Sequence, residues 1–183
     1  ILTLTGTFDL SFMFYQCYNL TTINNLNSWN TTFITNMEEM FSEVSSFNQN
    51  IGNWDVSNCT NMVSMFSNTV FNNGGSPSIS GWTTSGVTNM SGMFANTLFD
   101  QNIGNWNVSN VTTMQDMFLN VTLSRTNYDA LLIDWAEQNV KPNVLFGAVN
   151  LTYCVGEITR QSLIDDKGWL FTGDQLECAT AGV

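Results

Sequence analysis

The chain repeats one stretch of its own sequence with few changes. Residues 51–66 read IGNWDVSNCTNMVSMF, and residues 103–118 read IGNWNVSNVTTMQDMF. The dipeptide Met-Phe occurs five times, at spacings of 27, 25, 28 and 24 residues. The five copies are Met13-Phe14, Met40-Phe41, Met65-Phe66, Met93-Phe94 and Met117-Phe118. A period near 25 residues is typical of one coil of a repeat protein, so we expect each copy to be one structural unit.

A tryptophan stands eight residues before the first Met of four of the Met-x-x-Met-Phe boxes. Counting around it gives the apolar frame L-x-x-L-x-L-x-x-N/C-x-x-L of leucine-rich repeats. In one copy the frame is filled by Ile51, Trp54, Val56, Cys59 and Met62. The alternation of Trp54 and Val56 predicts a short strand with both side chains on one face. Trp54 and its equivalent Trp106 are therefore predicted to be core residues, the alternative being an aromatic platform for sugar rings.

The boxes open with residue types that favour helix N-caps. These residues are Asp9, Asn36, Asn61, Asn89 and Thr113. Met37, Met40 and Phe41 follow at i, i+3 and i+4, one face of a helical turn. We therefore expect a leucine-rich-repeat solenoid over residues 1–120, with short parallel strands on one face and short helical or 3-10 turns on the other.

About five coils fit this span, and the first is incomplete. Aligning it with the second coil places Leu2 at the Trp29 position and Leu4 at the Thr31 position. No polar capping segment precedes it, so we expect its open end either to continue into further repeats or to be covered by another copy of the chain.

Residues 121–183 are expected to form a small α+β cap on the last coil. Thr126 begins a Thr-x-x-Asp capping pattern, which predicts a helix ending near Lys141-Pro142. A short apolar stretch follows at 143–147, a second helix is predicted from about Glu157 to Asp166, closed by Gly168, and a last strand is predicted at 169–171. Cys154 and Cys178 bracket this segment, so they are predicted to form a disulfide worth roughly 3 kcal/mol. Cys17 and Cys59 lie about two coils apart and are predicted not to bond to each other.

The charge balance excludes several classes of partner. The net charge is −11, and all four Lys and Arg residues follow residue 118. Nucleic acid and anionic lipid bind through such residues, so neither is expected as a partner. The sequence contains no run of about 18 apolar residues, so membrane insertion is not expected. Histidine is absent, and the carboxylate pairs Glu38-Glu39 and Asp165-Asp166 indicate a solvated surface. We therefore predict no catalytic residue, metal or cofactor, and no enzyme.

The repeats also carry a family resemblance. The box F-N-Q-N-I-G-N-W-D-V-S-N-x-T-N-M-x-x-M-F at residues 47–66, repeated with small changes at 99–118, resembles the repeat of BspA-like leucine-rich-repeat surface proteins. Residues 127–178 are similar to the segment that closes such arrays. The resemblance implies a secreted or cell-surface protein with an adhesive or host-binding role, and it supplies no catalytic residues.

Three functions are compatible with these patterns. The first is a module that binds a protein or glycan at a cell surface through a shallow polar face. That face would comprise Asp55, Ser57, Thr83, Ser85, Asn107 and Ser109. The second is a subunit of an extracellular filament, joined end to end through the first coil. The third is an ice- or polysaccharide-binding Thr/Ser array, which the irregular residues at those positions argue against.

The chain also contains Asn-x-Ser/Thr sequons at which a glycan could be attached. One further sequon asparagine, Asn89, is expected to serve as a helix cap instead. The possible glycosylation sites are Asn19, Asn30, Asn58, Asn107, Asn110, Asn120 and Asn150.

Overall fold

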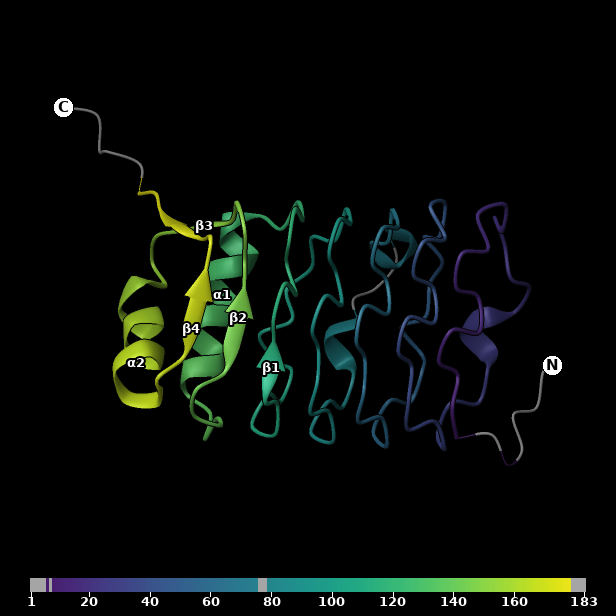
Figure 1. Ribbon diagram of the computed structural model, residues 1–183, viewed down its shortest axis with the longest axis horizontal. Coiled ribbons are helices and arrows are strands. Elements are labelled where there is room, and N and C mark those ends of the chain that lie inside the picture. The colour runs from purple at the N-terminus through teal and green to yellow at the C-terminus, as the bar shows by residue number, and fades with distance from the viewer. Residues whose placement is uncertain (1–5, 7, 76–78, 179–183) are drawn as a thin grey trace.

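A computed structural model describes residues 6, 8–75 and 79–178 (Figure 1). Successive repeats lie side by side along the long axis, with the first repeat at one end and helix α2 at the other. The expected frame positions Leu2 and Leu4 lie outside the described residues.

The prediction of a leucine-rich-repeat solenoid is wrong. Within the described ranges, α-helix is confined to α1 and α2, and the strands all lie at or after Thr113. Trp54 and Val56 belong to no strand. Neighbouring repeats instead pair through single parallel bridges, and these fall on residues that the sequence assigned to helix caps. The bridges are Asp9↔Asn36, Asn36↔Asn61, Asn61↔Asn89 and Asn89↔Thr113.

The expected helical turns are also absent from the Met-x-x-Met-Phe boxes. In the second box, Met40 N donates to Met37 O at 3.3 Å, which closes a turn. The intervening Glu39 has φ of 50°, in the left-handed region, and its N–H donates to Val63 O of the next repeat at 2.8 Å. A left-handed residue interrupts both a helix and a strand. Each box is therefore a run of tight turns whose alternate N–H groups pair with the next repeat.

The core was predicted correctly at most frame positions. Trp54 is 3% exposed, and Trp106 is fully buried. Phenylalanine rings stack along the axis, as for Phe41 on Phe66 with centroids 6.0 Å apart. Met13 is the exception among the Met-Phe pairs: it is 42% exposed, whereas the equivalent Met40 is fully buried.

Helix α1 (Arg125–Ala136) packs on the last repeat. Its N-cap is Ser124, two residues before the predicted Thr126, and the Ser124 side chain accepts a hydrogen bond from Asn127 N. It ends at Ala136, well before Lys141, and residues on both sides of this end bind the last repeat. Trp135 Nε1 donates to Ile103 O at 3.3 Å, and Gln138 Nε2 donates to Trp106 O at 2.9 Å. Trp135 thus bonds to Ile103 as Trp106 Nε1 bonds to Ile79 O one repeat earlier.

The remaining elements close the C-terminal end. The elements are β1 (Thr113–Met114), β2 (Leu145–Gly147), β3 (Thr152–Tyr153), α2 (Glu157–Lys167), β4 (Leu170–Thr172) and β5 (Gln175–Leu176). Strands β1, β2 and β4 form one parallel sheet, and β3 pairs with β5 in another. Helix α2 ends at Gly168, as predicted, and this glycine has φ of 68°. Three 3-10 turns lie between successive Met-x-x-Met-Phe boxes. They are η1 (Leu26–Ser28), η2 (Asn73–Gly75) and η3 (Ile79–Gly81).

Candidate functional site

The predicted polar face forms two neighbouring columns of side chains. Thr84 Oγ1 donates to Asn107 O at 3.0 Å, and Thr31 Oγ1 donates to Asp55 O at the same distance, which fixes successive repeats against one another. In two of the repeats the side-chain oxygen that opens the face accepts hydrogen bonds from within its own repeat. Asp55 Oδ1 accepts from Ser57 N at 3.0 Å, and this bonding lowers the pKa of Asp55. Asn107 Oδ1 accepts from both N and Oγ of Ser109. The side chains of Asp55 and Asn107 are therefore held in place within their own repeats.

An asparagine ladder runs along another edge. Asn96 Nδ2 donates to Asn68 Oδ1 at 2.8 Å, Asn120 Nδ2 to Asn96 Oδ1 at 3.1 Å, and Asn150 Nδ2 to Asn120 Oδ1 at 3.2 Å. Asn68 Nδ2 donates in turn to Glu43 Oε1 at 2.9 Å. All five residues have positive φ, between 53° and 71°. The ladder holds the repeats in register at the outer surface.

These hydrogen bonds bear on the possible glycosylation sites, because a glycan is attached to the side-chain amide nitrogen. In four of the seven sites this nitrogen donates to the preceding repeat. The four are Asn58, Asn110, Asn120 and Asn150. The other three, Asn19, Asn30 and Asn107, are exposed, and no bond from their amide nitrogen exists in the described part of the chain.

The exposed aromatic side chains of the described residues all lie between Phe8 and Phe33, in the first two repeats. We call this set the aromatic face; its members are Phe8, Phe12, Tyr15, Tyr18 and Phe33, which are 58%, 49%, 38%, 56% and 55% exposed. The rings of Phe12 and Tyr15 meet edge to face, with centroids 5.8 Å apart. Thr35 N donates to Phe8 O at 2.7 Å, so Phe8 lies against the segment that carries Phe33. The sequence reasoning missed this face.

The alignment of the repeats contains the signal that could have found it. The bridges align Phe12 with Glu39, Ser64, Gly92 and Asp116 of the later repeats. They likewise align Phe8 with Thr35, Thr60, Thr88 and Thr112, and Phe33 with Asn58, Gly86 and Asn110. Three outward positions that are polar or small elsewhere are thus aromatic here.

The backbone at Phe12 has the left-handed conformation that recurs at its equivalents Glu39, Ser64, Gly92 and Asp116. Its φ is 58°, in the left-handed region, where a bulky side chain is a conformational outlier. Such a conformation costs roughly 1–2 kcal/mol, and half of the side chain is exposed, so little packing offsets the cost. The repeat geometry imposes this backbone, and what distinguishes Phe12 is an exposed ring at a position that is small or polar elsewhere. The exposed rings therefore make the aromatic face the strongest candidate site.

The acidic residues beside this face belong to the second repeat. Glu38 and Glu39 are half-buried, and Glu38 Oε2 accepts from Asn61 Nδ2 at 3.0 Å. Burial, and then the charges of Glu38 and Glu43, raise the pKa of Glu39. These carboxylates therefore lie close enough to repel one another.

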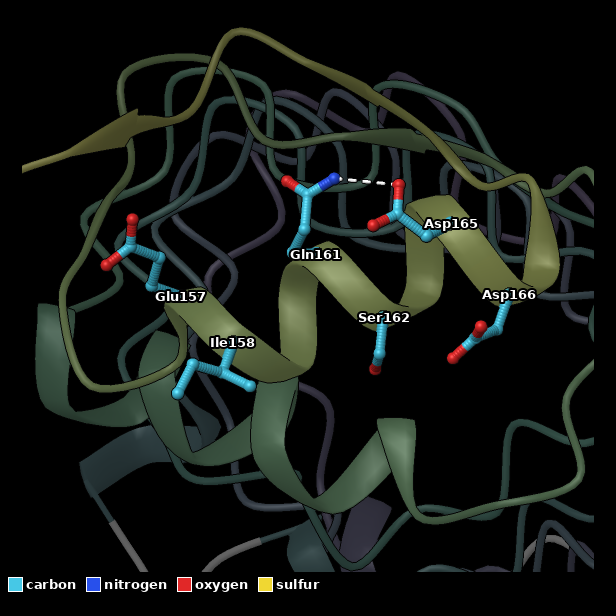
Figure 2. Close-up of a pocket in the computed structure, with 6 residues that line it drawn as sticks. All are labelled: Glu157, Ile158, Gln161, Ser162, Asp165 and Asp166. Carbon is cyan, nitrogen blue, oxygen red and sulfur yellow. Dashed lines mark hydrogen bonds between the residues drawn. The ribbon is translucent and has the colours of Figure 1, made fainter.

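A second acidic surface lies on α2. A shallow open groove of about 590 Å³ is lined by Glu157, Ile158, Gln161, Ser162, Asp165 and Asp166 (Figure 2). Ile158 is 82% exposed, and the neighbouring Val155 is 72% exposed. Gln161 Nε2 donates to Asp165 Oδ1 at 2.9 Å. The groove follows one helix and holds no converging set of polar groups, so it resembles a solvated helix face more than a ligand pocket.

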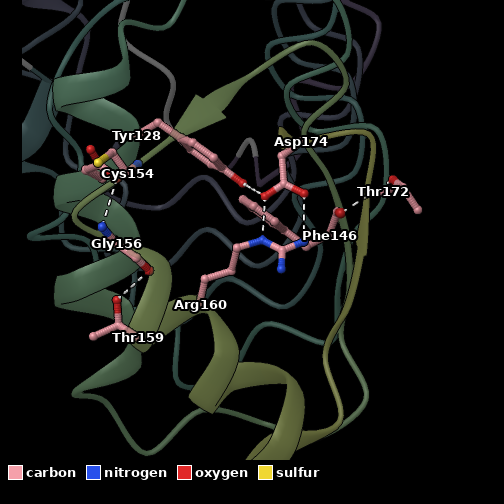
Figure 3. A network of polar contacts seen from close by, with 9 residues as sticks. Tyr128, Phe146, Cys154, Gly156, Thr159, Arg160, Thr172 and Asp174 are labelled. Carbon is pink, nitrogen blue, oxygen red and sulfur yellow. Dashed lines mark hydrogen bonds and ion pairs between the residues drawn. The ribbon is translucent and has the colours of Figure 1, made fainter. Parts of the chain in front are cut away.

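A polar network ties the C-terminal strands to the helices (Figure 3). Arg160 pairs with Asp174 through two hydrogen bonds of 2.7 and 2.8 Å, and Tyr128 Oη donates to Asp174 at 2.8 Å. The guanidinium also lies over the rings of Tyr153 and Phe171, at 4.9 and 4.4 Å. Burial, followed by the Asp174 charge, raises the pKa of Tyr128 well above its usual value. The network is stably paired and structural.

The predicted disulfide between Cys154 and Cys178 is present, with an S–S distance of 2.05 Å. Cys17 and Cys59 are both free; Cys17 is exposed, and burial raises the pKa of Cys59 to about 12. Disulfides persist in oxidising compartments, so the bond indicates that the protein folds in an oxidising environment.

The described residues contain no group of three or more His, Cys, Asp and Glu side chains arranged to hold a metal ion. The α-helices of the described residues are α1 and α2, and neither is long and apolar enough to cross a membrane.

Comparison with protein families gives one match. A family model described as "Mycoplasma protein of unknown function, DUF285" matches residues 8–131, which cover the repeats and the first half of α1. Comparison with curated proteins and with solved structures found no match. Since the family model covers more than half of the chain, the protein belongs to the DUF285 family.

Proposed function

We propose that the protein is a non-enzymatic interaction module, secreted or displayed at a cell surface, and that it binds its partner through the aromatic face. The resemblance to BspA-like surface proteins and the disulfide support the location. The aromatic face is the observation that carries the proposal. Exposed aromatic side chains are enriched in protein interfaces and are unusual on a surface that contacts only water.

The design of the repeats strengthens this reasoning. Phe8, Phe12 and Phe33 occupy outward positions that the later repeats fill with small or polar residues. The fold therefore does not need an aromatic ring at these positions. Large exposed rings that do not serve the core are consistent with a binding role.

An end-to-end filament is the second candidate. Met13 is 42% exposed, so the first repeat offers an apolar side chain for such a contact. Charge weighs against it. The charged side chains of the first two repeats are all acidic, and a second copy would bring a net charge of −11 to the contact. Like charges across an interface oppose association, so a partner of different composition is favoured.

A binding screen with a matched variant tests the proposal. Phe8→Thr, Phe12→Ser and Phe33→Asn replace each ring with a residue that another repeat carries at the same position, so the triple variant should fold normally. We expect the labelled protein to bind members of an array of extracellular proteins and glycans, and the triple variant to lose that binding.

The control variant Val155→Ser/Ile158→Ser removes two exposed apolar side chains at the other end of the molecule and should bind as the unmodified protein does. Equal binding by both variants, with folding intact, would contradict the assignment of the site. Sedimentation velocity of the same samples separates the module from the filament, because only the filament predicts concentration-dependent polymers.

A further inference from the structure

The aromatic face adjoins three carboxylates of the next repeat. The bridge between Asp9 and Asn36 aligns Ser11 with Glu38, Phe12 with Glu39 and Gln16 with Glu43. Phe12 N donates to Glu38 O at 2.9 Å, so the two backbones are in direct contact. Backbone segments joined by parallel hydrogen bonds of this kind lie about 4.8 Å apart. The side chains of Phe12 and Glu39 are therefore attached at neighbouring backbone positions on the same surface.

No cation of the described chain compensates these carboxylates. All four Lys and Arg residues follow residue 118. The ion pair found in the described ranges joins Arg160 to Asp174, at the opposite end of the molecule. Glu38 and Glu43 accept hydrogen bonds from Asn61 and Asn68, which are neutral donors. The negative charge beside the rings thus stays unbalanced within the protein.

We propose that the aromatic face and the carboxylates of Glu38, Glu39 and Glu43 together bind a protein segment rich in Lys or Arg. This inference rests on the proposed function and names the chemistry of the partner. A cationic side chain would lie against the ring of Phe12 or Tyr15, and its charge would meet the carboxylates. Cation–π contact and ion pairing act on the same group.

The protein contains this combination once already. The guanidinium of Arg160 lies 4.4 Å from the ring centroid of Phe171 and pairs with Asp174 at 2.7 Å. In that network the arginine is supplied by the chain itself. At the aromatic face the rings and carboxylates are present, and the cation has to come from a partner.

Charge complementarity also selects among possible occupants. Anionic lipids, nucleic acids and sulfated glycans would be repelled by the carboxylates. A second copy offers four cations against fifteen acids, and one of these cations, Arg160, is held by Asp174. A basic protein segment satisfies both the rings and the charge.

Titration calorimetry with defined peptides tests the inference. The probes are deca-lysine and deca-arginine, with deca-glutamate as the negative control, each added to the full chain. The first variant, Glu38→Gln/Glu39→Gln/Glu43→Gln, removes three charges and keeps the oxygens that accept from Asn61 and Asn68. The matched control, Glu157→Gln/Asp165→Asn/Asp166→Asn, removes three charges from the α2 groove of Figure 2.

We expect the cationic peptides to bind the unmodified chain and the α2 variant with similar affinity, and the Glu38/Glu39/Glu43 variant at least about tenfold more weakly. Phe12→Ser/Tyr15→Ser, which leaves the charge unchanged, should also weaken binding by roughly three- to tenfold. Binding should weaken as salt is raised from about 50 to 500 mM, because exposed charges are screened.

Equal losses in the two charge variants would overturn the inference, since binding would then follow net charge alone. Unchanged binding in Phe12→Ser/Tyr15→Ser would do the same. Failure of the inference is distinguishable from failure of the proposed function. If the cationic peptides do not bind but the array screen still depends on Phe8, Phe12 and Phe33, the interaction module stands and its partner has another chemistry.

Discussion

Two tryptophans at equivalent positions allow the indole hydrogen bond to be isolated from packing. Trp82 and Trp106 are 4% and 0% exposed, and they stack on each other with centroids 5.9 Å apart. Trp106 Nε1 donates to Ile79 O at 3.0 Å. Trp82 Nε1 is buried and has no hydrogen-bond partner in the described structure. Substitution by Phe at either position removes the same atoms and disturbs the contact between the two rings, and Trp106 also packs against Phe94 with centroids 6.1 Å apart.

The two substitutions should therefore differ through the N–H group. Trp106→Phe loses a hydrogen bond worth about 1 kcal/mol, and Ile79 O keeps its bond from Trp82 N at 3.1 Å. Trp82→Phe removes a buried donor whose lack of a partner costs roughly 1–3 kcal/mol, so part of the packing loss is offset. The free energy of unfolding should fall at least about 2 kcal/mol further for Trp106→Phe than for Trp82→Phe.

Urea unfolding followed by far-ultraviolet circular dichroism measures this difference without relying on tryptophan fluorescence. Equal slopes of the free energy against urea would show that both variants unfold over the same surface. As a reference, Trp106→Ala should lower the free energy of unfolding by about 3–5 kcal/mol. Equal losses for the two Phe variants would refute the reasoning, because the Trp82 indole would then have a partner in the folded protein.

Three further predictions concern charge, the disulfide and glycosylation. Since the folded-state pKa of Glu39 is raised, its ionisation opposes folding at neutral pH; Glu39→Gln should raise the urea midpoint at pH 7, and the gain should vanish as the pH falls below the ordinary value of 4.5. A gain that persists at pH 3 would contradict this. Replacing Cys154 and Cys178 by Ser should lower the free energy of unfolding by roughly 3 kcal/mol and expose β5 to protease; an unchanged digestion pattern would show that β3 holds β5 unaided. Expressed in a glycosylating host, the protein should carry glycan at Asn19, Asn30 or Asn107 by mass spectrometry. Full occupancy at Asn120, whose amide donates to Asn96, would mean that the asparagine ladder does not form.

The sequence predicted the core better than the backbone that surrounds it. Apolar residues recur at fixed spacing because each repeat buries the same side chains, so Trp54 and Trp106 could be identified without a structure. The strands and helical turns were wrong because backbone conformation at the outer positions is not encoded by apolar spacing. Glu39 and Ser64 adopt positive φ, although neither residue type signals it.

Signals for those turns were nevertheless present. Gly92 stands at the position of Glu39 and Ser64, and asparagine recurs at Asn68, Asn96 and Asn120. Glycine and asparagine tolerate the left-handed region better than other residues, so comparing the repeats position by position indicates turns there. The same comparison would have identified the aromatic face, since Phe12 is the aromatic residue in that column.

The C-terminal segment was more predictable because its signals are local. Gly168 closes α2 at a left-handed residue, and Cys154 and Cys178 are joined across a separation of 24 residues. The end of α1 was misplaced because Gln138 bonds to the backbone of Trp106 and Val108. Such a contact between distant residues leaves no periodic trace in the sequence.

The side-by-side arrangement of the repeats has a mechanical consequence. A force that pulls the two ends of the molecule apart loads the boundaries between neighbouring repeats, and the weakest boundary opens first. Each released repeat of 24 to 28 residues adds roughly 85 Å of extended chain. The segment between Cys154 and Cys178 stays short, because the disulfide carries the load. A protein of this build under tension would lengthen in steps and dissipate work at each one, while its covalently closed end kept its shape.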